Sequence, residues 1–173
     1  MNRKTDSIHI QPTIENDDLA KLLGGQKKKS LSKSIRKKVR TARQKLYKLI
    51  IPSVHYRIVK PSAMDNDVVQ LDETVEFSST QLAKTLKNAE EIVCFVGTIG
   101  TGVENEINRL MGKQQLAEAY ILDAMASVAV ENMIDRFQDL MENKCSAEDR
   151  TVTLRFSPGY CDWPVTQQKK LFD

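Results

Sequence analysis

The architecture of this chain is best predicted from the segment QLAEAYILDAMASVAVENMIDRFQDLME, which runs from Gln115 to Glu142. Its apolar residues recur every three or four positions, as they do along one face of an α-helix. Alanine, valine and methionine crowd beside this face, so the segment is apolar over much of its circumference. We therefore predict one long central helix with the apolar stripe Leu122, Ala126, Ala129, Met133, Phe137 and Leu140.

The clearest strand lies upstream in the continuous apolar run EIVCFVG, residues 91–97. Such a run predicts a strand that is buried on both faces. It leads through the glycine turn GTIGTG (Gly97–Gly102) into a predicted helix, VENEINRLM. A turn of this kind can hold an anion at the helix N-terminus, but no Lys-Ser or Lys-Thr follows as in a P-loop. A tight strand-to-helix turn is the favoured interpretation.

The remaining elements follow from periodicity and capping residues. A short helix, LAKLLGG, follows Asn16, and a longer helix begins at Ser30 or Ser32 and ends at Pro52. The longer helix carries the stripe Leu31, Ile35, Val39, Ala42, Leu46 and Leu49. Further helices are predicted at 81–89, capped by Ser79 or Thr80, and at 166–172, and strands at 54–59, 68–71, 73–77 and 150–156. Because helices and strands do not alternate strictly, we predict an α+β fold with a mainly antiparallel sheet.

Composition limits the kind of protein. The 173 residues are 40% hydrophobic and 28% charged, which fits one soluble domain of ordinary size. No apolar run approaches the roughly 20 residues of a membrane-spanning helix, and we expect a cytoplasmic protein. The cysteines Cys94, Cys145 and Cys161 form no CxxC pair, and only two histidines occur. This pattern indicates neither a disulfide framework nor a thiol-rich zinc site, and the two histidines disfavour a His-based metal site or a Ser-His-Asp triad. A nucleophilic Cys161 would need a basic partner from elsewhere.

Charge is unevenly distributed along the chain. Residues Gln26–Lys48 hold 11 Lys and Arg and no acidic residue. The rest of the chain holds the other 15 basic residues and all 23 acidic residues, which gives it a net charge of −8. A solvated helix face is the favoured interpretation, and docking onto an acidic partner protein is the alternative. The segment has one aromatic residue, Tyr47, and lacks an RNA-binding signature, which disfavours nucleic acid.

Two further features are candidate sites. On the long helix, Asp123, Ser127 and Glu131 lie at i, i+4 and i+8, a polar line that marks either a site or an exposed face. Near the end of the chain, RFSPGYCDWP (155–164) combines an arginine that can grip a carboxylate with a Pro-Gly turn and two aromatic rings. From these residues alone, a ligand site and a turn whose aromatics cover the core are equally favoured.

Three motifs occur in a meaningful order: CFVGTIGTGVENEI, AYILDAMASVAVENMIDRF and RFSPGYCDWPVTQQKKLF. This series resembles the activation domain of cobalamin-dependent methionine synthase, and most of all its short, free-standing members. The resemblance spans Leu19 to Asp173 and is most specific at Arg-x-x-Pro-Gly-Tyr. It implies an activation-like domain at 31–173. The residues before it, 1–30, are predicted from their own sequence to form a flexible N-terminal region with a short helix.

The resemblance also implies a fold and a ligand. The family has a curved, mixed domain built on a twisted antiparallel sheet, and it binds S-adenosylmethionine in a shallow groove. By position, Arg155 would hold the ligand's carboxylate, and Glu131 would lie near its positive end. The backbone of Ser157, Pro158 and Gly159 would meet the adenine and ribose, and Tyr160 would line the groove. No catalytic residue and no metal ligand is implied.

Some parts of the synthase have no counterpart here. No Asp-x-His-x-x-Gly motif and no zinc thiolate set occurs, so cobalamin would be held by a partner protein and the homocysteine, folate and cobalamin modules are absent. The family continues well beyond the last motif, which on this comparison makes 31–173 a C-terminally truncated domain.

The predicted function is an S-adenosylmethionine-binding activation module. It would support reductive methylation of the cobalamin of a corrinoid protein or methyltransferase, with a flavodoxin-type or ferredoxin-type electron donor. The alternative is a non-catalytic interaction protein that keeps the fold and docks an acidic partner through its basic helix.

Overall fold

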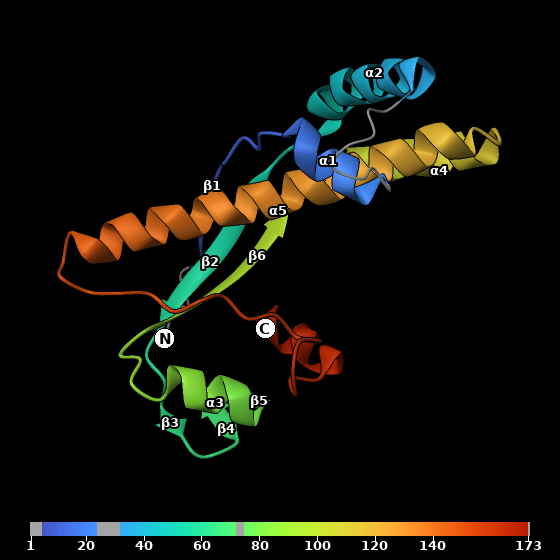
Figure 1. The fold of residues 1–173 in the computed structure, drawn as a ribbon. Helices are drawn as coiled ribbons and strands as arrows, with labels where there is room; N and C mark the ends of the chain where they lie inside the picture. The colour runs from blue at the N-terminus through green and yellow to red at the C-terminus, as the bar shows by residue number, and fades with distance from the viewer. Residues whose placement is uncertain (1–4, 24–31, 72–74, 173) are drawn as a thin grey trace. The chain divides into compact units, whose positions relative to one another are not determined.

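The structure is a computed structural model that describes residues 5–23, 32–71 and 75–172. It is an α+β fold with two small antiparallel sheets and one long helix, as predicted (Figure 1). In chain order the elements are β1 (Asp6–Ile8), α1 (Asn16–Leu22), α2 (Lys33–Leu49), β2 (Ser53–Val59), β3 (Ala63–Met64), β4 (Val68–Gln70), β5 (Glu76–Ser78), α3 (Thr80–Leu86), β6 (Ile92–Thr98), α4 (Gly102–Gly112), α5 (Leu116–Ser146) and the 3-10 helix η1 (Val165–Leu171).

The described residues fall into two compact units. The helical unit lies within Ile8–Val54 and Gly97–Phe137. The mixed unit lies within Met1–Ser7, His55–Val96 and Gln138–Asp173. The predicted boundary between 30 and 31 lies outside the described residues. Within the predicted flexible region, the structure places β1 and the predicted short helix, α1, and it buries Ile10 and Ile14.

The core of the helical unit forms around the first half of α5. Helices α1, α2 and α4 gather beside this half (Figure 1). Of the predicted stripe, Leu122, Ala129, Met133 and Phe137 are buried, whereas Ala126 is half-buried and Leu140 is exposed. The long helix is therefore confirmed, and most of its stripe faces a core.

Helix α2 begins where the sequence predicts. The Ser32 hydroxyl accepts a hydrogen bond from the Ile35 amide at 3.3 Å, which caps the first turn. Of the predicted stripe, Ala42 and Leu46 are buried, Val39 and Leu49 are partly buried, and Ile35 is exposed. The first stripe residue, Leu31, lies outside the described residues.

The glycine turn between β6 and α4 is a close-packed connection. Gly100 has a φ of +79°, and its amide donates to the Thr98 hydroxyl at 3.0 Å. A Cβ atom on Gly102 would lie 2.7 Å from the backbone oxygen of Leu49, so a larger side chain does not fit there. These contacts support the interpretation as a tight strand-to-helix turn.

Two sheets contain all the strands of the described residues. The strand orders are β1-β2-β6 and β3-β4-β5. In the second sheet both pairs are antiparallel, with Val69 opposite Phe77. The predicted strands at 54–59, 68–71 and 91–97 are confirmed as β2, β4 and β6. The predicted strand at 73–77 corresponds to β5, although residues 72–74 lie outside the described residues.

Two strand predictions were wrong in part or in full. Strand β6 is half-buried from Ile92 to Gly97 rather than buried on both faces, because it is the edge strand of a small antiparallel sheet. Residues 150–156 form no strand. Phe156 packs against the core of the mixed unit without joining a strand ladder, whereas Leu154, another apolar residue of the alternating pattern, is 79% exposed. Among residues 5–23, 32–71 and 75–172, every helix is too short or too polar to span a membrane.

Candidate functional site

The candidate site is the turn that follows Arg155. Gly159 has a φ of +99°, which favours glycine, and Cys161 also has a positive φ of +51°. The turn is closed by its own backbone, because the Gly159 amide donates to the Trp163 carbonyl at 2.7 Å. The Trp163 amide in turn donates to the Tyr160 carbonyl at 3.0 Å. The turn is therefore a folded loop and not an extended tail.

One side of the turn is fastened to helix α3. The Asp162 carboxylate accepts hydrogen bonds from the Ser79 hydroxyl at 2.5 Å and from the Thr80 amide at 2.7 Å. These groups stand at the N-terminus of α3, where backbone amides lack helical partners and a negative charge is favoured. The Ser79 hydrogen bond is the main reason that the pKa of Asp162 lies below its usual range. Asp162 therefore acts as a second cap for α3.

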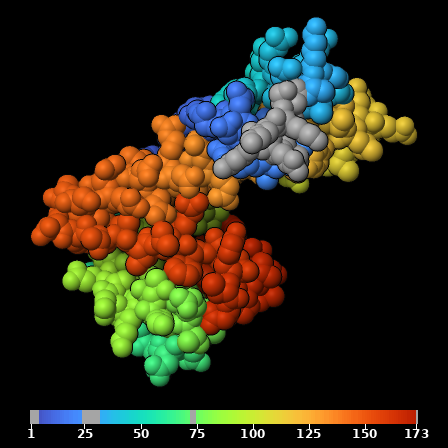
Figure 2. Space-filling model, in the orientation of Figure 1, coloured from blue at the N-terminus to red at the C-terminus, as the bar shows by residue number. Residues whose placement is uncertain are grey.

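The adjacent tryptophan covers the core of the mixed unit. Trp163 is buried and packs edge-on against Phe77, with ring centroids 5.1 Å apart. Its indole Nε1 donates to Gln167 Oε1 at 3.2 Å, and the same oxygen accepts from the Ser78 amide at 3.0 Å. In Figure 2 the C-terminal segment (red) lies directly against the segment that contains α3 (light green). For Trp163, the interpretation as core cover is confirmed.

The other side of the turn faces solvent. Arg155, Ser157 and Gly159 are exposed, and the Tyr160 side chain is 68% exposed. The Arg155 guanidinium lies 3.5 Å from Gln138 Oε1. Contrary to expectation, the turn does not free all its amides, since those of Gly159 and Tyr160 are used within it. The Ser157 amide and the carbonyls of Pro158 and Gly159 have no hydrogen-bond partner among the described residues.

The polar line of α5 lies at the surface. Asp123, Ser127 and Glu131 are all exposed, and the Ser127 hydroxyl donates to the Asp123 carbonyl at 3.2 Å. Glu131 belongs to the helical unit and Arg155 to the mixed unit, so their separation is not defined. The structure brings together Arg155, Ser157, Pro158, Gly159 and Tyr160, and the part assigned to Glu131 stays a prediction.

The anchoring contacts of the turn were not anticipated. Asp162 reaches Ser79 across 83 residues of sequence, and nothing local indicates that pairing. The predicted cap at Ser79 was the only available signal, because a helix N-terminus attracts a carboxylate. The residue types alone do not distinguish Trp163 from Tyr160 as ring surfaces, whereas the structure buries Trp163 and exposes Tyr160.

The cysteines differ in reactivity. Burial raises the pKa of the Cys94 thiol to about 11, whereas Cys161 is exposed. At pH 8 we expect iodoacetamide to modify Cys94 roughly 100-fold more slowly than an ordinary thiol, because only the thiolate reacts. Mass spectrometry of the digested protein should find the label first at Cys161. Equal rates at Cys94 and Cys161 would contradict this. In a Cys145→Ser background, which removes the third and half-buried thiol, Cys161→Ser should leave only the slow reaction of Cys94.

No protein-family model matches this chain, and no curated protein is significantly similar to it.

Proposed function

We propose that this chain is an S-adenosylmethionine-binding activation module. It would support reductive methylation of the cobalamin of a partner methyltransferase of the methionine synthase type. The observation that carries the proposal is that the RFSPGYCDWP turn has one anchored side and one solvent-exposed side. Asp162 and Trp163 hold the turn in place, while Arg155 and Tyr160 face solvent.

The chemistry of the exposed groups suits this ligand. A guanidinium can hold the carboxylate of the methionine part through two parallel hydrogen bonds. Adenine needs both acceptors and donors, which the carbonyls of Pro158 and Gly159 and the amide of Ser157 can supply. The Tyr160 ring offers a flat face to the adenine or to the positive sulfonium. Glu131 would complement the positive end of the ligand.

The ligand would supply the methyl group, and the chain would act by orienting it. The cobalamin would stay on a corrinoid protein or methyltransferase, and a flavodoxin-type or ferredoxin-type protein would supply the electron. No side chain of this chain is assigned an acid, base or nucleophile role. Its contribution would be to hold the donor in the geometry that the partner requires.

Calorimetric titration with S-adenosylmethionine tests the proposal. We expect the wild-type chain to bind and Arg155→Ala to lose at least tenfold in affinity, because removing a charge-assisted pair costs about 1.5–3 kcal/mol. Arg40→Ala is the matched control, since Arg40 is an exposed arginine on α2 and is not a residue of the turn. Absence of binding by the wild type would refute the function, and equal affinity of the two variants would remove Arg155 from the site.

A comparison with S-adenosylhomocysteine extends the same experiment to Glu131. S-adenosylhomocysteine, the product of methyl transfer, lacks the sulfonium charge of S-adenosylmethionine. A carboxylate near the sulfur should therefore bind S-adenosylmethionine, the substrate, more tightly than this product. Glu131→Gln should therefore reduce that preference and leave the product's affinity unchanged. An unchanged preference would remove Glu131 from the proposed site.

A second function is favoured by the charge of α2. Its exposed cations without a partner among the described residues are Lys33, Arg36, Lys37, Arg40 and Lys48. They lie on one face of the helix, which would suit an acidic partner protein. The alternative is accordingly an interaction protein that keeps the fold and binds no ligand. The S-adenosylmethionine titration separates the two, because docking alone requires no ligand.

A further inference from the structure

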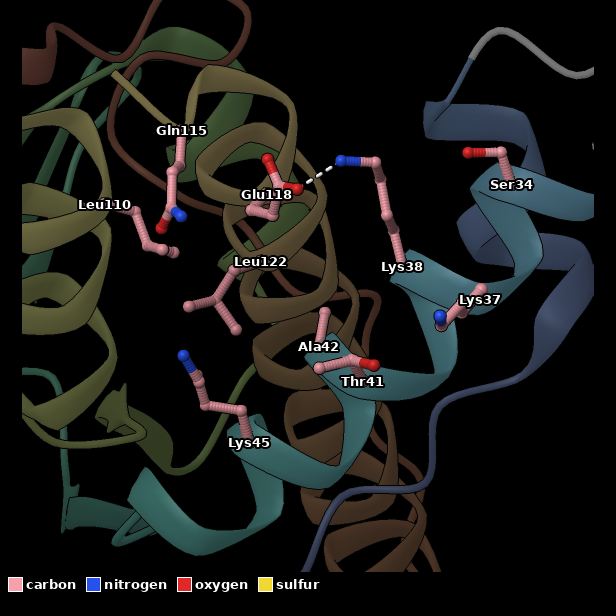
Figure 3. Close-up of a pocket in the computed structure, with 10 residues that line it drawn as sticks. All are labelled: Ser34, Lys37, Lys38, Thr41, Ala42, Lys45, Leu110, Gln115, Glu118 and Leu122. Carbon is pink, nitrogen blue, oxygen red and sulfur yellow. Dashed lines mark hydrogen bonds and ion pairs between the residues drawn. The ribbon is translucent and has the colours of Figure 1, made fainter. Parts of the chain in front are cut away.

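A second candidate site lies in the helical unit, away from the turn in the sequence. A cavity of about 360 Å³ opens between helices α2, α4 and α5 (Figure 3). This volume is within the usual range of small-molecule sites, about 300–1,000 Å³. It is lined by Ser34, Lys37, Lys38, Thr41, Ala42, Lys45, Leu110, Gln115, Glu118 and Leu122.

The walls of the cavity are chemically divided. Ala42, Leu110 and Leu122 give it an apolar floor, and all three are buried in the core of the helical unit. The rim carries lysine side chains from α2 together with the hydroxyls of Ser34 and Thr41. An apolar floor below a polar rim suits a ligand with an apolar body and a charged end.

The charges around the cavity do not cancel. Lys38 reaches across to Glu118, and the two form an ion pair (Figure 3). Lys45 lies 2.5 Å from Glu106, which also pairs with Arg109 at 2.6 Å.

Glu106 and Glu118 remain ionised at neutral pH. Hydrogen bonds from Arg109 and Lys45 lower the pKa of Glu106 to about 2, and the Lys38 hydrogen bond lowers the pKa of Glu118. The Lys38 pair is therefore neutral, whereas the group of Lys45, Glu106 and Arg109 keeps one positive charge.

Lys37 adds a charge that nothing else balances. It lines the cavity, it is exposed, and it has no hydrogen-bond or ion-pair partner among the described residues. The residues that line the cavity therefore carry a net charge of +2, from three lysines, Lys37, Lys38 and Lys45, and one glutamate, Glu118. Such a field attracts anions and disfavours cations.

We propose that this cavity binds a small amphipathic anion, with a carboxylate or phosphate at the lysine rim of α2 and an aliphatic or aromatic body on Ala42, Leu110 and Leu122. The apolar body gains free energy by leaving water, and the anionic end is held by the ammonium groups. This site goes beyond the proposed function, because it uses neither Arg155 nor any other residue of the turn.

Calorimetry with four probes tests the proposal. Sodium octanoate has both an anionic end and a chain, octanamide keeps the chain without the charge, and acetate keeps the charge without the chain. We expect octanoate to bind at least tenfold more tightly than octanamide and acetate to give no measurable heat. Octyl phosphate then separates the two head groups, since the tighter of the two anions identifies the natural one.

Two variants assign the binding to the cavity. Lys37→Glu should weaken octanoate about tenfold or more, because it replaces attraction at the rim with repulsion. Arg40→Glu makes the same change in net charge one turn further along α2, outside the cavity lining, and should alter the affinity by no more than about twofold. Circular dichroism should confirm that both variants remain folded.

Three outcomes would overturn the proposal. Equal affinity for octanoate and octanamide would make the cavity a purely apolar pocket. Equal losses in Lys37→Glu and Arg40→Glu would assign the effect to the general charge of α2. No octanoate binding by the wild type would refute the site itself. None of these outcomes depends on S-adenosylmethionine binding, so the two proposals fail separately.

Discussion

Trp163→Ala is expected to lower the free energy of unfolding by about 3–5 kcal/mol, as in other truncations of buried aromatic residues. The indole is buried against Phe77, and its Nε1 hydrogen bond to Gln167 would also be lost. Gln167 would still accept from the Ser78 amide, so the loss should come mainly from the cavity left beside Phe77. Urea unfolding followed by circular dichroism measures the change, because the variant lacks the chain's only tryptophan.

Tyr160→Ala is the matched control for this variant. Tyr160 belongs to the same turn, but its side chain is 68% exposed, so truncation should change the free energy of unfolding by no more than about 0.5 kcal/mol. A large loss in Tyr160→Ala would mean that the tyrosine has a structural role and is no ligand surface. A small loss in Trp163→Ala would mean that the turn is not anchored through its indole.

The different burial of Trp163 and Tyr160 indicates that the RFSPGYCDWP turn combines anchoring residues with exposed candidate binding residues. Trp163 and Asp162 hold the turn against Phe77 and α3, and Arg155 and Tyr160 are presented to solvent. A ligand site needs rigid support for its contact residues, because loose side chains must be ordered upon binding. The density of special residues in RFSPGYCDWP is explained if half of them provide that support.

Local signals predicted the helices well. Ser32 and Ser79 cap α2 and α3 as expected, because a hydroxyl that accepts from an amide three residues later needs no distant partner. The apolar stripe of α5 was equally readable, since helical spacing of 3.6 residues is a property of the segment itself. The glycine turn before α4 was also recognisable from residues that lie next to one another.

Long-range pairing could not be read in the same way. Residues 150–156 alternate like a strand, yet whether such a segment joins a ladder depends on a partner that is distant in the sequence. The same holds for Lys38 and Glu118, which are 80 residues apart, and for the cavity that they border. The burial of β6 was overestimated because an apolar run does not reveal whether its strand is central or at an edge.

The candidate site was predicted only in part. Arg155 to Tyr160 could be chosen from residue types, because a Pro-Gly turn beside an arginine and a tyrosine is chemically distinctive. Which aromatic ring is buried could not be chosen, since Tyr160 and Trp163 stand three residues apart in an irregular segment. Periodicity assigns faces in helices and strands, and a turn with positive φ at Gly159 and Cys161 has no such period.

Met125→Ala is expected to lower the free energy of unfolding of the helical unit by about 2–5 kcal/mol. Met125 is fully buried in the core that α5 forms with α1, α2 and α4. Truncation leaves a cavity along the helix, while the high helix propensity of alanine keeps α5 itself intact. Urea unfolding followed at 222 nm measures the effect, because this core holds the helices of the unit together.

Met111→Ala makes the same chemical change at a surface position and is the matched control. Met111 lies on α4 with its side chain 53% exposed, so its truncation should change the free energy of unfolding by less than about 0.5 kcal/mol. The difference between the two variants isolates burial from residue type, since both remove the same thioether. If the two losses were equal, α5 would not be the centre of a packed core, and the rigid walls that the proposed anion cavity needs would be absent.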